Sequence, residues 1–364
     1  MPFRALSLIC FSRRSSYIGA IMAETVFVAD IGANKLSAAV LDRDGKVLAR
    51  RTEALDFSAT QAPVKQIARI ADELSNGKPR FCAAGIAVAG LVRCDGTVCA
   101  GQVPGWDKVP LARLLQAKLG IPIFVVSDRN AAVLGETWRG AGRGRNNVVV
   151  LTVGASVGAG IVCGGRLLRG AHDLSGAAGW MAVSESDGFE VRKFGGLEAF
   201  ASEPAIVRAA KNAVQTGLGG ELAEFEPDAF TAEDVAELAR RGNAICMQIY
   251  RRAGKLLGLA VANLISLFDP DVVVFGGSLA SASDLFWDDL THTALARCFP
   301  MSARLARIRI SGLGEDANLH GAGYMAWQGA NAAASPPASY EDPHQVSATK
   351  VKKRPTARVH AAAR

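Results

Sequence analysis

The sequence predicts an α/β protein built from two similar domains, and three observations support this prediction. The chain has 364 residues, about the length of two domains. Hydrophobic residues make up 49% of it and charged residues 21%, so it has enough apolar side chains for a sizeable core. A strand, a glycine-rich turn and a second strand occur around Gly32 and again around Gly154, each time followed by further strands and helices. We therefore expect a duplicated α/β architecture rather than an array of short repeats.

In the first half of the chain, short β-rich runs alternate with turn signals and with segments of helical periodicity. Strands are expected at 25–30, 36–41, 46–52, 81–88 and 123–126, and helices at 61–74, 111–119 and 130–138. The run DRDG at 42–45 has the composition of a hairpin turn. Asp128 follows an apolar strand and precedes a helix, so we expect it to cap that helix.

The second half repeats this plan. Strands are expected at 147–153, 160–163, 271–275 and 307–310, and helices at 203–215, 232–240, 243–267 and 320–328. Composition and element order together predict five segments: a leader at 1–22 that is disordered or reflects a mis-assigned start, an N-terminal α/β domain at 23–140, a C-terminal α/β domain at 141–317, a helix at 318–330 that returns to the N-terminal domain, and a disordered basic tail at 331–364.

Charge and cysteine content exclude several function classes. The net charge is +7, but six Lys or Arg and no acid lie within 350–364, so the excess belongs largely to a tail and we expect no specific nucleic-acid partner. No apolar run reaches the ~20 residues that a membrane helix needs, so no membrane association is expected. The seven cysteines form no C-x-x-C pair, which argues against a disulfide framework and fits a reducing cytoplasm, where we expect the protein.

Three short segments and Asp128 are suited to nucleotide and hydroxyl chemistry. DIGANK at 30–35, TVGASVGAG at 152–160 and GGS at 276–278 are glycine-rich turns beside apolar strands, where backbone N–H groups can face phosphate oxygens. Taken alone, each is explained about as well by an ordinary turn. Asp30 can hold a Mg²⁺-bound water, and Asp128 can accept a proton from an attacking hydroxyl, although a plain helix-capping aspartate is the simpler interpretation of Asp128.

The order of these motifs resembles the ROK family (repressors, open reading frames and sugar kinases) across 26–329, and most closely its glucokinase-like sugar kinase branch. DIGANK resembles the family's D-I-G-G-T-K, GIAVAG at 85–90 its G-I-G-V-P-G, and SDRN at 127–130 its N-D-A-N. LTVGASVGAGIV at 151–162 and GRLLRGAH at 165–172 are also very similar to family segments. The resemblance implies an actin-like ATPase fold of two ribonuclease H-like domains, as in sugar kinases, Hsp70 and actin.

The resemblance also implies roles for individual residues. Asp128 would be the catalytic base, and Asp30 would orient Mg²⁺ through water. The residues implied at the nucleotide phosphates are Asp30, Gly32, Asn34, Lys35, Gly154, Ala155, Ser156, Gly276 and Gly277. Those implied at the substrate are Ser127, Asp128, Ala177, Trp180 and Glu198. ATP with Mg²⁺ is the expected cosubstrate and cofactor.

The sequence departs from the family pattern at the sugar and zinc positions. The family's G-E-x-G-H aligns with GAAGW at 176–180, so Ala177 and Trp180 replace the Glu and His that contact sugar. Its C-x-C-G-x-x-G-C-L-E aligns with FEVRKFGGLE at 189–198, where all three zinc cysteines are absent and Glu198 remains. We therefore expect no structural zinc, and we expect packing of Phe189, Phe194 and Trp180 to hold this loop instead.

The favoured function is an ATP-dependent sugar kinase of the ROK family that phosphorylates a hexose or a related sugar with an Asp general base. The alternative is a catalytically impaired ROK protein that binds sugar as a sensor, because the polar sugar ligands are lost. A DNA-binding repressor is disfavoured, since only 29 residues precede Asp30 and they show no two-helix pattern. The expected partners are a small sugar and ATP, and a homodimer is left open.

Overall fold

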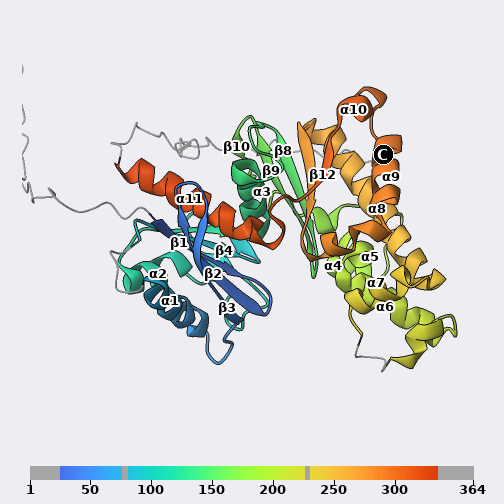
Figure 1. Ribbon diagram of the computed structural model, residues 1–364, viewed down its shortest axis with the longest axis horizontal. Coiled ribbons are helices and arrows are strands. Elements are labelled where there is room, and N and C mark those ends of the chain that lie inside the picture. Colours follow the sequence, from blue (N-terminus) through green and yellow to red (C-terminus); the bar gives the residue numbers. More distant parts are fainter. Residues whose placement is uncertain (1–24, 76–80, 226–229, 335–364) are drawn as a thin grey trace, which may run out of the picture.

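The first half of the chain forms a five-stranded sheet with helices on both faces (Figure 1). The computed structural model describes residues 25–75, 81–225 and 230–334, so the predicted leader and all but the first residues of the predicted tail lie outside it. The elements of this half are β1 (Thr25–Ile31), β2 (Lys35–Asp42), β3 (Val47–Ala54), α1 (Ala62–Ser75), β4 (Ala84–Val88), β5 (Leu91–Val92), β6 (Val98–Cys99), α2 (Leu111–Leu119), β7 (Ile123–Ser127) and α3 (Asp128–Arg139).

The second half forms another five-stranded sheet with most of its helices on one side (Figure 1). Its strands are β8 (Val148–Val153), β9 (Val157–Cys163), β10 (Arg166–Leu167), β11 (Val272–Gly276) and β12 (Ile308–Ile310). Its α-helices are α4 (Phe189–Phe194), α5 (Glu198–Ala201), α6 (Glu203–Gln215), α7 (Ala232–Arg240), α8 (Ala244–Phe268), α9 (Trp287–Arg297), α10 (Pro300–Leu305) and α11 (Ala317–Ala334). The 3₁₀ helices are η1 (Ala178–Trp180), η2 (Gly220–Glu224), η3 (Ser278–Leu285) and η4 (Gly314–Asp316).

The two sheets have the same topology. Their strand orders are β3-β2-β1-β4-β7 and β10-β9-β8-β11-β12, which is third, second, first, fourth, fifth in each case. In both sheets the first three strands pair antiparallel, and the last two run parallel to the first. This repeated order confirms the predicted duplicated α/β fold. The domain boundaries placed at 140, 317 and 330 stay predictions.

Strand β1 shows why the first sheet has two covered faces. Phe27 and Ile31 point to one side, where they join the core that includes residues of α1 and α2. Val26 and Val28 point to the other side and join residues of α3 and α11. Because successive side chains in a strand alternate between faces, an apolar run such as TVFVAD is buried on both sides. Asp30 at its end is thereby carried to the edge of the core.

Helices α3 and α11 lie between the two sheets. The cluster that holds Val28 of the first sheet also holds Val150 and Val274 of the second, together with residues of both helices. The two helices pack so closely that a Cβ on Gly321 would lie 1.8 Å from the carbonyl oxygen of Ala131. Only glycine fits at this crossing. The C-terminal helix therefore returns to α3 and the first sheet, as Figure 1 shows.

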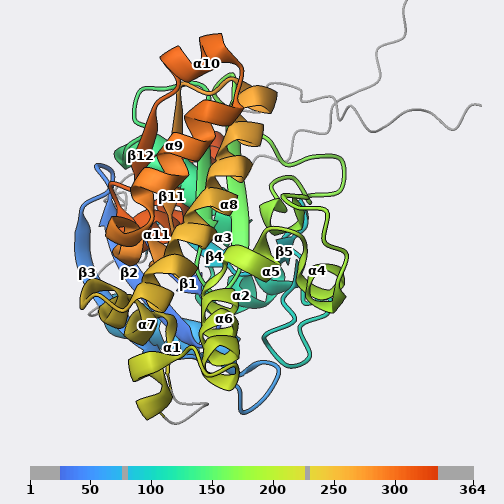
Figure 2. The same ribbon diagram turned by 90° about the vertical axis from the view of Figure 1, so that its right-hand side faces the viewer.

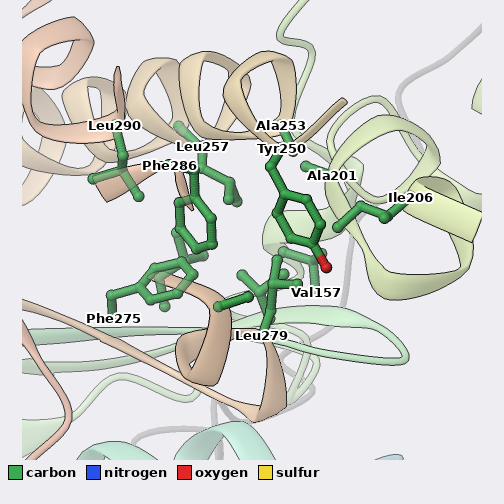
Figure 3. Packing of buried hydrophobic residues seen from close by; sticks show 14 of the residues in the cluster. Val157, Ala201, Ile206, Tyr250, Ala253, Leu257, Phe275, Leu279, Phe286 and Leu290 are labelled. Carbon is green, nitrogen blue, oxygen red and sulfur yellow. The ribbon is translucent and has the colours of Figure 1, made fainter. Parts of the chain in front are cut away.

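The other face of the second sheet packs on the long helix α8 (Figure 2). Figure 3 shows part of this core, in which Tyr250 and Leu257 of α8 meet Phe275 of β11 and Phe286. Tyr250 is buried, and its hydroxyl donates a hydrogen bond of 2.6 Å to the carbonyl oxygen of Ala232, so its polar end is satisfied. In the described part of the chain, no helix is both long and apolar enough to cross a bilayer.

Candidate active site between the two sheets

A cleft opens where strands of both sheets end. Its walls come from β1 and the turn after it, from the start of α3, and from the turns after β8 and β11. Nine of the residues predicted to act at the site line this one cleft: Asp30, Gly32, Lys35, Asp128, Gly154, Ala155, Ser156, Gly276 and Gly277. The structure thus brings the three glycine-rich turns and both aspartates together.

Asp30 is held at the end of β1 by a residue far away in sequence. The side-chain amide of Asn318 in α11 donates a hydrogen bond of 3.2 Å to Asp30 Oδ2. The other oxygen, Oδ1, is buried and has no hydrogen-bond partner among the residues that the structure describes. Burial raises the pKa of Asp30 to about 7, against the lowering effect of the Asn318 bond. An unpaired buried carboxylate oxygen is the kind of acceptor that a Mg²⁺-bound water would satisfy, so the site fits that ion.

Asp128 is the first residue of α3, and the prediction that it caps this helix was wrong. The N-cap is Ser127, whose side chain makes no capping bond to any described residue. Asp128 Oδ1 instead accepts a hydrogen bond of 2.8 Å from the backbone N–H of Arg129. Burial raises the pKa of Asp128 above its ordinary value, while this N–H and the Arg129 charge lower it. The carboxylate therefore faces the cleft as a better proton acceptor than an exposed aspartate.

The turns after β8 and β11 pack against each other with little room between them. Gly277 has a φ of +88°, and a Cβ there would lie 2.3 Å from the carbonyl oxygen of Val153. Gly154 donates a backbone hydrogen bond of 3.0 Å to the carbonyl of Ser156. The two turns thus place backbone at the carboxyl ends of the parallel strands β8 and β11. This is the place where α/β folds bind nucleotides.

Two ion pairs border the cleft on the side of the first sheet. Lys35 Nζ lies 2.8 Å from Glu315 Oε2, and Arg50 pairs with Asp316. Lys35 lines the cleft, but its charge is engaged with η4. Asn34 is exposed and does not line the cleft; its backbone carbonyl accepts a bond of 2.9 Å from Leu55 N–H.

Of the residues predicted on the substrate side, Asp128 lines this cleft, whereas Ser127, Ala177, Trp180 and Glu198 do not. Ser127 is buried, and its hydroxyl has no partner in the described residues. Glu198 Oε2 accepts a bond of 2.8 Å from Val157 N–H, directly after the Gly154–Ser156 turn, and burial raises the pKa of Glu198. Ala177 is exposed, and Trp180 is 62% exposed.

The expected packing of the loop that carries Glu198 was also wrong. Phe189 is 72% exposed and Trp180 is nearly as open, so neither fills a core. Of the three aromatic residues, only Phe194 is half-buried. Within residues 25–75, 81–225 and 230–334, no group of three or more His, Cys, Asp or Glu side chains gathers where a metal ion could be held.

Two residues of the site escaped the sequence analysis. Asn318 lies in a helix far along the chain, and no local pattern connects it with Asp30. Arg129 was visible beside Asp128, but its contacts were not: its side chain donates from Nε to the carbonyl of Ser175 at 3.0 Å and from Nη2 to that of Asp173 at 3.4 Å. Arg129 thereby ties the start of α3 to the loop that precedes Ala177.

Comparison with known proteins identifies the family. A family model described as "ROK family" matches residues 26–328. The chain belongs to the ROK family. This confirms the resemblance drawn from the motifs, and with it the actin-like ATPase fold.

Several ROK relatives are sugar kinases. A glucokinase from Thermotoga maritima is 31% identical over 300 residues, which cover 80% of this chain and 94% of that protein. A crystal structure of a ROK family glucokinase from Streptomyces griseus, in complex with glucose and AMPPNP, has a TM-score of 0.74 and 29% identity; the match covers 84% of this chain and 99% of that one. A xylose repressor from Caldicellulosiruptor bescii is 30% identical over 63% of this chain and 58% of that protein. The chain is thus similar to ROK sugar kinases, in a family that also contains repressors.

Proposed function

We propose that the protein is an ATP-dependent sugar kinase that phosphorylates a hexose or a related sugar, with Asp128 as general base. One observation carries the proposal: Asp30 and Asp128 line the same cleft as the glycine turns at 154–156 and 276–277. A phosphoryl-transfer enzyme needs a phosphate cradle, a carboxylate for the metal and a base for the hydroxyl in one place. The glucokinase relatives support the same conclusion.

The turns at 154–156 and 276–277 would hold the nucleotide phosphates through their backbone N–H groups. Asp30 would hold a metal-bound water through its unpaired Oδ1, while Asn318 keeps Oδ2 in place. When bound together with ATP, Mg²⁺ supplies positive charge that offsets the charge on the transferring phosphoryl group. Lys35 would reach the phosphates only after leaving Glu315, so we assign it a secondary role.

Asp128 would take the proton of the sugar hydroxyl as that oxygen attacks the γ-phosphorus. One O–P bond forms, the bond between the γ-phosphorus and the bridging oxygen breaks, and ADP leaves with the electron pair. Burial raises the pKa of Asp128, which strengthens it as a base, and the N–H of Arg129 keeps one carboxylate oxygen oriented.

The sugar would lie between Asp128 and the segment 177–198. Glu198 and Ser127 would hydrogen-bond its hydroxyls, and Trp180 would offer an apolar face for the ring. Ala177 offers no polar side-chain group. A site that hydrogen-bonds fewer hydroxyls discriminates less strongly among sugars, so we expect broader or different selectivity than that of a strict glucokinase.

A sugar-binding sensor without catalysis is the second candidate. The exposed positions of Ala177 and Trp180, where the family pattern has polar sugar ligands, favour it. The same cleft would then bind sugar and nucleotide without turnover.

An ADP-release assay of the full chain with Mg²⁺·ATP, across hexoses, pentoses and N-acetylhexosamines, separates the two. A kinase turns over at least one sugar, and Asp128→Asn lowers kcat by roughly 10²- to 10⁴-fold. Asp72→Asn, which changes an exposed aspartate on α1, serves as the matched control. Sugar binding detected by calorimetry, with no turnover of any sugar, would overturn the kinase proposal in favour of the sensor.

A further inference from the structure

The loop between η1 and α5 carries Glu198 but has no zinc ligands. Family members hold this loop with three cysteines and a histidine, whereas Phe189, Val191, Gly196 and Trp180 stand at those positions here. Zinc in proteins is bound by thiolate, imidazole or carboxylate groups, and none of these four side chains supplies one. The donor set therefore does not fit zinc, and another contact must hold the loop.

The backbone geometry of this loop also leaves no space for a ligating side chain at Gly196. A Cβ there would lie 2.5 Å from the carbonyl oxygen of Met181. At the neighbouring Gly195, with a φ of +93°, a Cβ would lie 2.4 Å from the carbonyl oxygen of Gly179. Leu197 N–H donates a hydrogen bond of 2.9 Å to that same carbonyl. The segments 179–181 and 195–197 thus contact each other through their backbones, and this contact fixes one end of the loop.

Arg208 on α6 contacts both short helices of this loop, α4 and α5. Arg208 donates from Nη2 to the carbonyl oxygen of Ala199 in α5 at 2.8 Å. Its guanidinium carbon lies 5.4 Å from the ring centroid of Phe194, the last residue of α4, and its Nε lies 3.5 Å from Glu190 Oε2. The half-buried Arg208 therefore joins both short helices of the loop to α6.

We propose that Arg208 is a positioning residue that cross-links α4 and α5 in place of a metal ion and so holds Glu198 beside the cleft. Glu198 adjoins Ala199, the residue whose carbonyl Arg208 binds. It also accepts the hydrogen bond from Val157 N–H, at the end of the phosphate turn. A loose α5 would therefore disturb the substrate side and the phosphate side together. This inference deepens the proposed kinase function and rests on it for its consequence in catalysis.

Lys193 provides a second cation at the same ring. Its Nζ lies 4.9 Å from the centroid of Phe194 and 5.7 Å from that of Phe189. Lys193 and both of these rings belong to α4, so these contacts lie within one helix. Arg208, in contrast, contacts both α4 and α5 from α6.

Hydrogen–deuterium exchange of the full chain tests the cross-link without any need for activity. Arg208→Met keeps the length of the side chain but removes its charge and its donors. Amides of residues 189–199 should exchange at least about tenfold faster, while those of α8 keep their rates. Arg208→Lys keeps the charge but lacks the planar fork, so its effect should be intermediate. Arg241→Met removes an exposed arginine that pairs with Glu221, and it should leave residues 189–199 unchanged.

Three outcomes would overturn the proposal: unchanged exchange at 189–199 in Arg208→Met, equally faster exchange throughout the second half, or faster exchange of the unmutated loop after a zinc chelator is added. Exchange does not depend on turnover, so it decides the cross-link even if no sugar is phosphorylated. With a sugar that is turned over, Arg208→Met should raise the KM for that sugar more than it lowers kcat. Equal loss in Arg241→Met would contradict a specific role.

Discussion

Asn318 donates a hydrogen bond from its side-chain amide to Asp30 Oδ2 at 3.2 Å, and this bond joins the start of α11 to the end of β1. It occupies one carboxylate oxygen and leaves Oδ1 without a partner among the described residues. It also opposes the effect of burial on the pKa of Asp30, because a donor stabilises the charged form. The returning helix therefore has a chemical role at the cleft as well as a packing role.

Asn318→Ala should raise the KM for Mg²⁺·ATP. Without the donor, the pKa of Asp30 rises further above about 7, so fewer molecules carry the charged carboxylate at neutral pH. One hydrogen bond to a charged group contributes about 1.5–3 kcal/mol, so the KM for Mg²⁺·ATP should rise at least about tenfold at pH 7. At pH 9 the difference should narrow. Asn212→Ala on the exposed face of α6 is the control, and a defect that does not change with pH would contradict this account.

Asp30→Asn should stabilise the protein in the absence of nucleotide at high pH. The pKa of Asp30 is about 7 in the folded protein and about 3.8 in the unfolded chain, so the folded state binds more protons between these values. The free energy of unfolding therefore falls as pH rises through this window. Asparagine does not titrate, so the variant should be more stable by about 1–3 kcal/mol at pH 8, with the gain shrinking toward pH 4.

Urea unfolding from pH 4 to pH 8 measures this difference. Asp72→Asn, an exposed aspartate, should follow the unmutated protein at every pH. Saturating Mg²⁺·ATP should reverse the order of the two proteins, because the chain that retains the carboxylate binds this ligand more tightly and is therefore stabilised more. A stability gain that is constant across pH would show that Asp30 is not the titrating group.

Local pattern predicted most of the sheets and several helices. The helices expected at 111–119, 203–215 and 232–240 match α2, α6 and α7 residue for residue. Their apolar spacing and terminal signals are clear, as in the capping box formed by Thr231 and Asp234. Helix α9 was missed because it buries only Leu290 and Ala294, so its apolar face is too narrow to show in the sequence.

The cleft was predictable where its residues follow strands, and not where they depend on packing. Asp30 lies at the end of one apolar strand, and Gly154 directly follows another. The carboxyl ends of parallel strands meet at one edge of a sheet. The pairing of Asn318 with Asp30 spans 288 positions and has no local signal. The exposure of Phe189 likewise depends on how α4 docks, which its own sequence does not determine.

Arg129→Met should move the acid limb of the pH profile of kcat/KM to higher pH. Burial raises the pKa of Asp128, and the positive charge of Arg129 lowers it, so removing that charge raises the pKa again. We expect the acid limb to lie at higher pH than in the unmutated protein, measured with the sugar that the kinase turns over. Arg129→Lys keeps the charge and should keep the acid limb in place.

The lysine variant also separates charge from positioning. A lysine cannot reach the carbonyls of both Ser175 and Asp173 with the fork that arginine uses, so the KM for sugar should rise in both variants. An acid limb that shifts equally in Arg129→Met and Arg129→Lys would contradict the electrostatic part of this prediction. An unchanged KM in both would contradict the positioning part.

Glu136→Ala should be the most destabilising of these substitutions. Glu136 is fully buried near the end of α3 and accepts hydrogen bonds from Ala141 N–H at 2.6 Å, Ser311 Oγ at 2.5 Å and Leu313 N–H at 3.2 Å. It thereby joins the chain leaving α3 to the chain entering α11, the two connections that run between the sheets. Alanine would remove all three of these part-buried hydrogen bonds to a carboxylate, at a cost of about 3–5 kcal/mol in the free energy of unfolding.

Thermal and urea unfolding measure this cost, and Glu136→Gln provides the graded comparison. Glutamine keeps the volume and one acceptor oxygen but turns the other into an amide, which cannot accept the N–H of Ala141. The free energy of unfolding of Glu136→Gln should therefore lie between that of the unmutated protein and that of Glu136→Ala. Because Glu136 joins both connections, the variants should unfold at a lower denaturant concentration, and the two sheets should unfold less cooperatively. Fully cooperative unfolding of both sheets in Glu136→Ala, as in the unmutated protein, would show that the bonds to Ser311 and Leu313 do not couple the two halves.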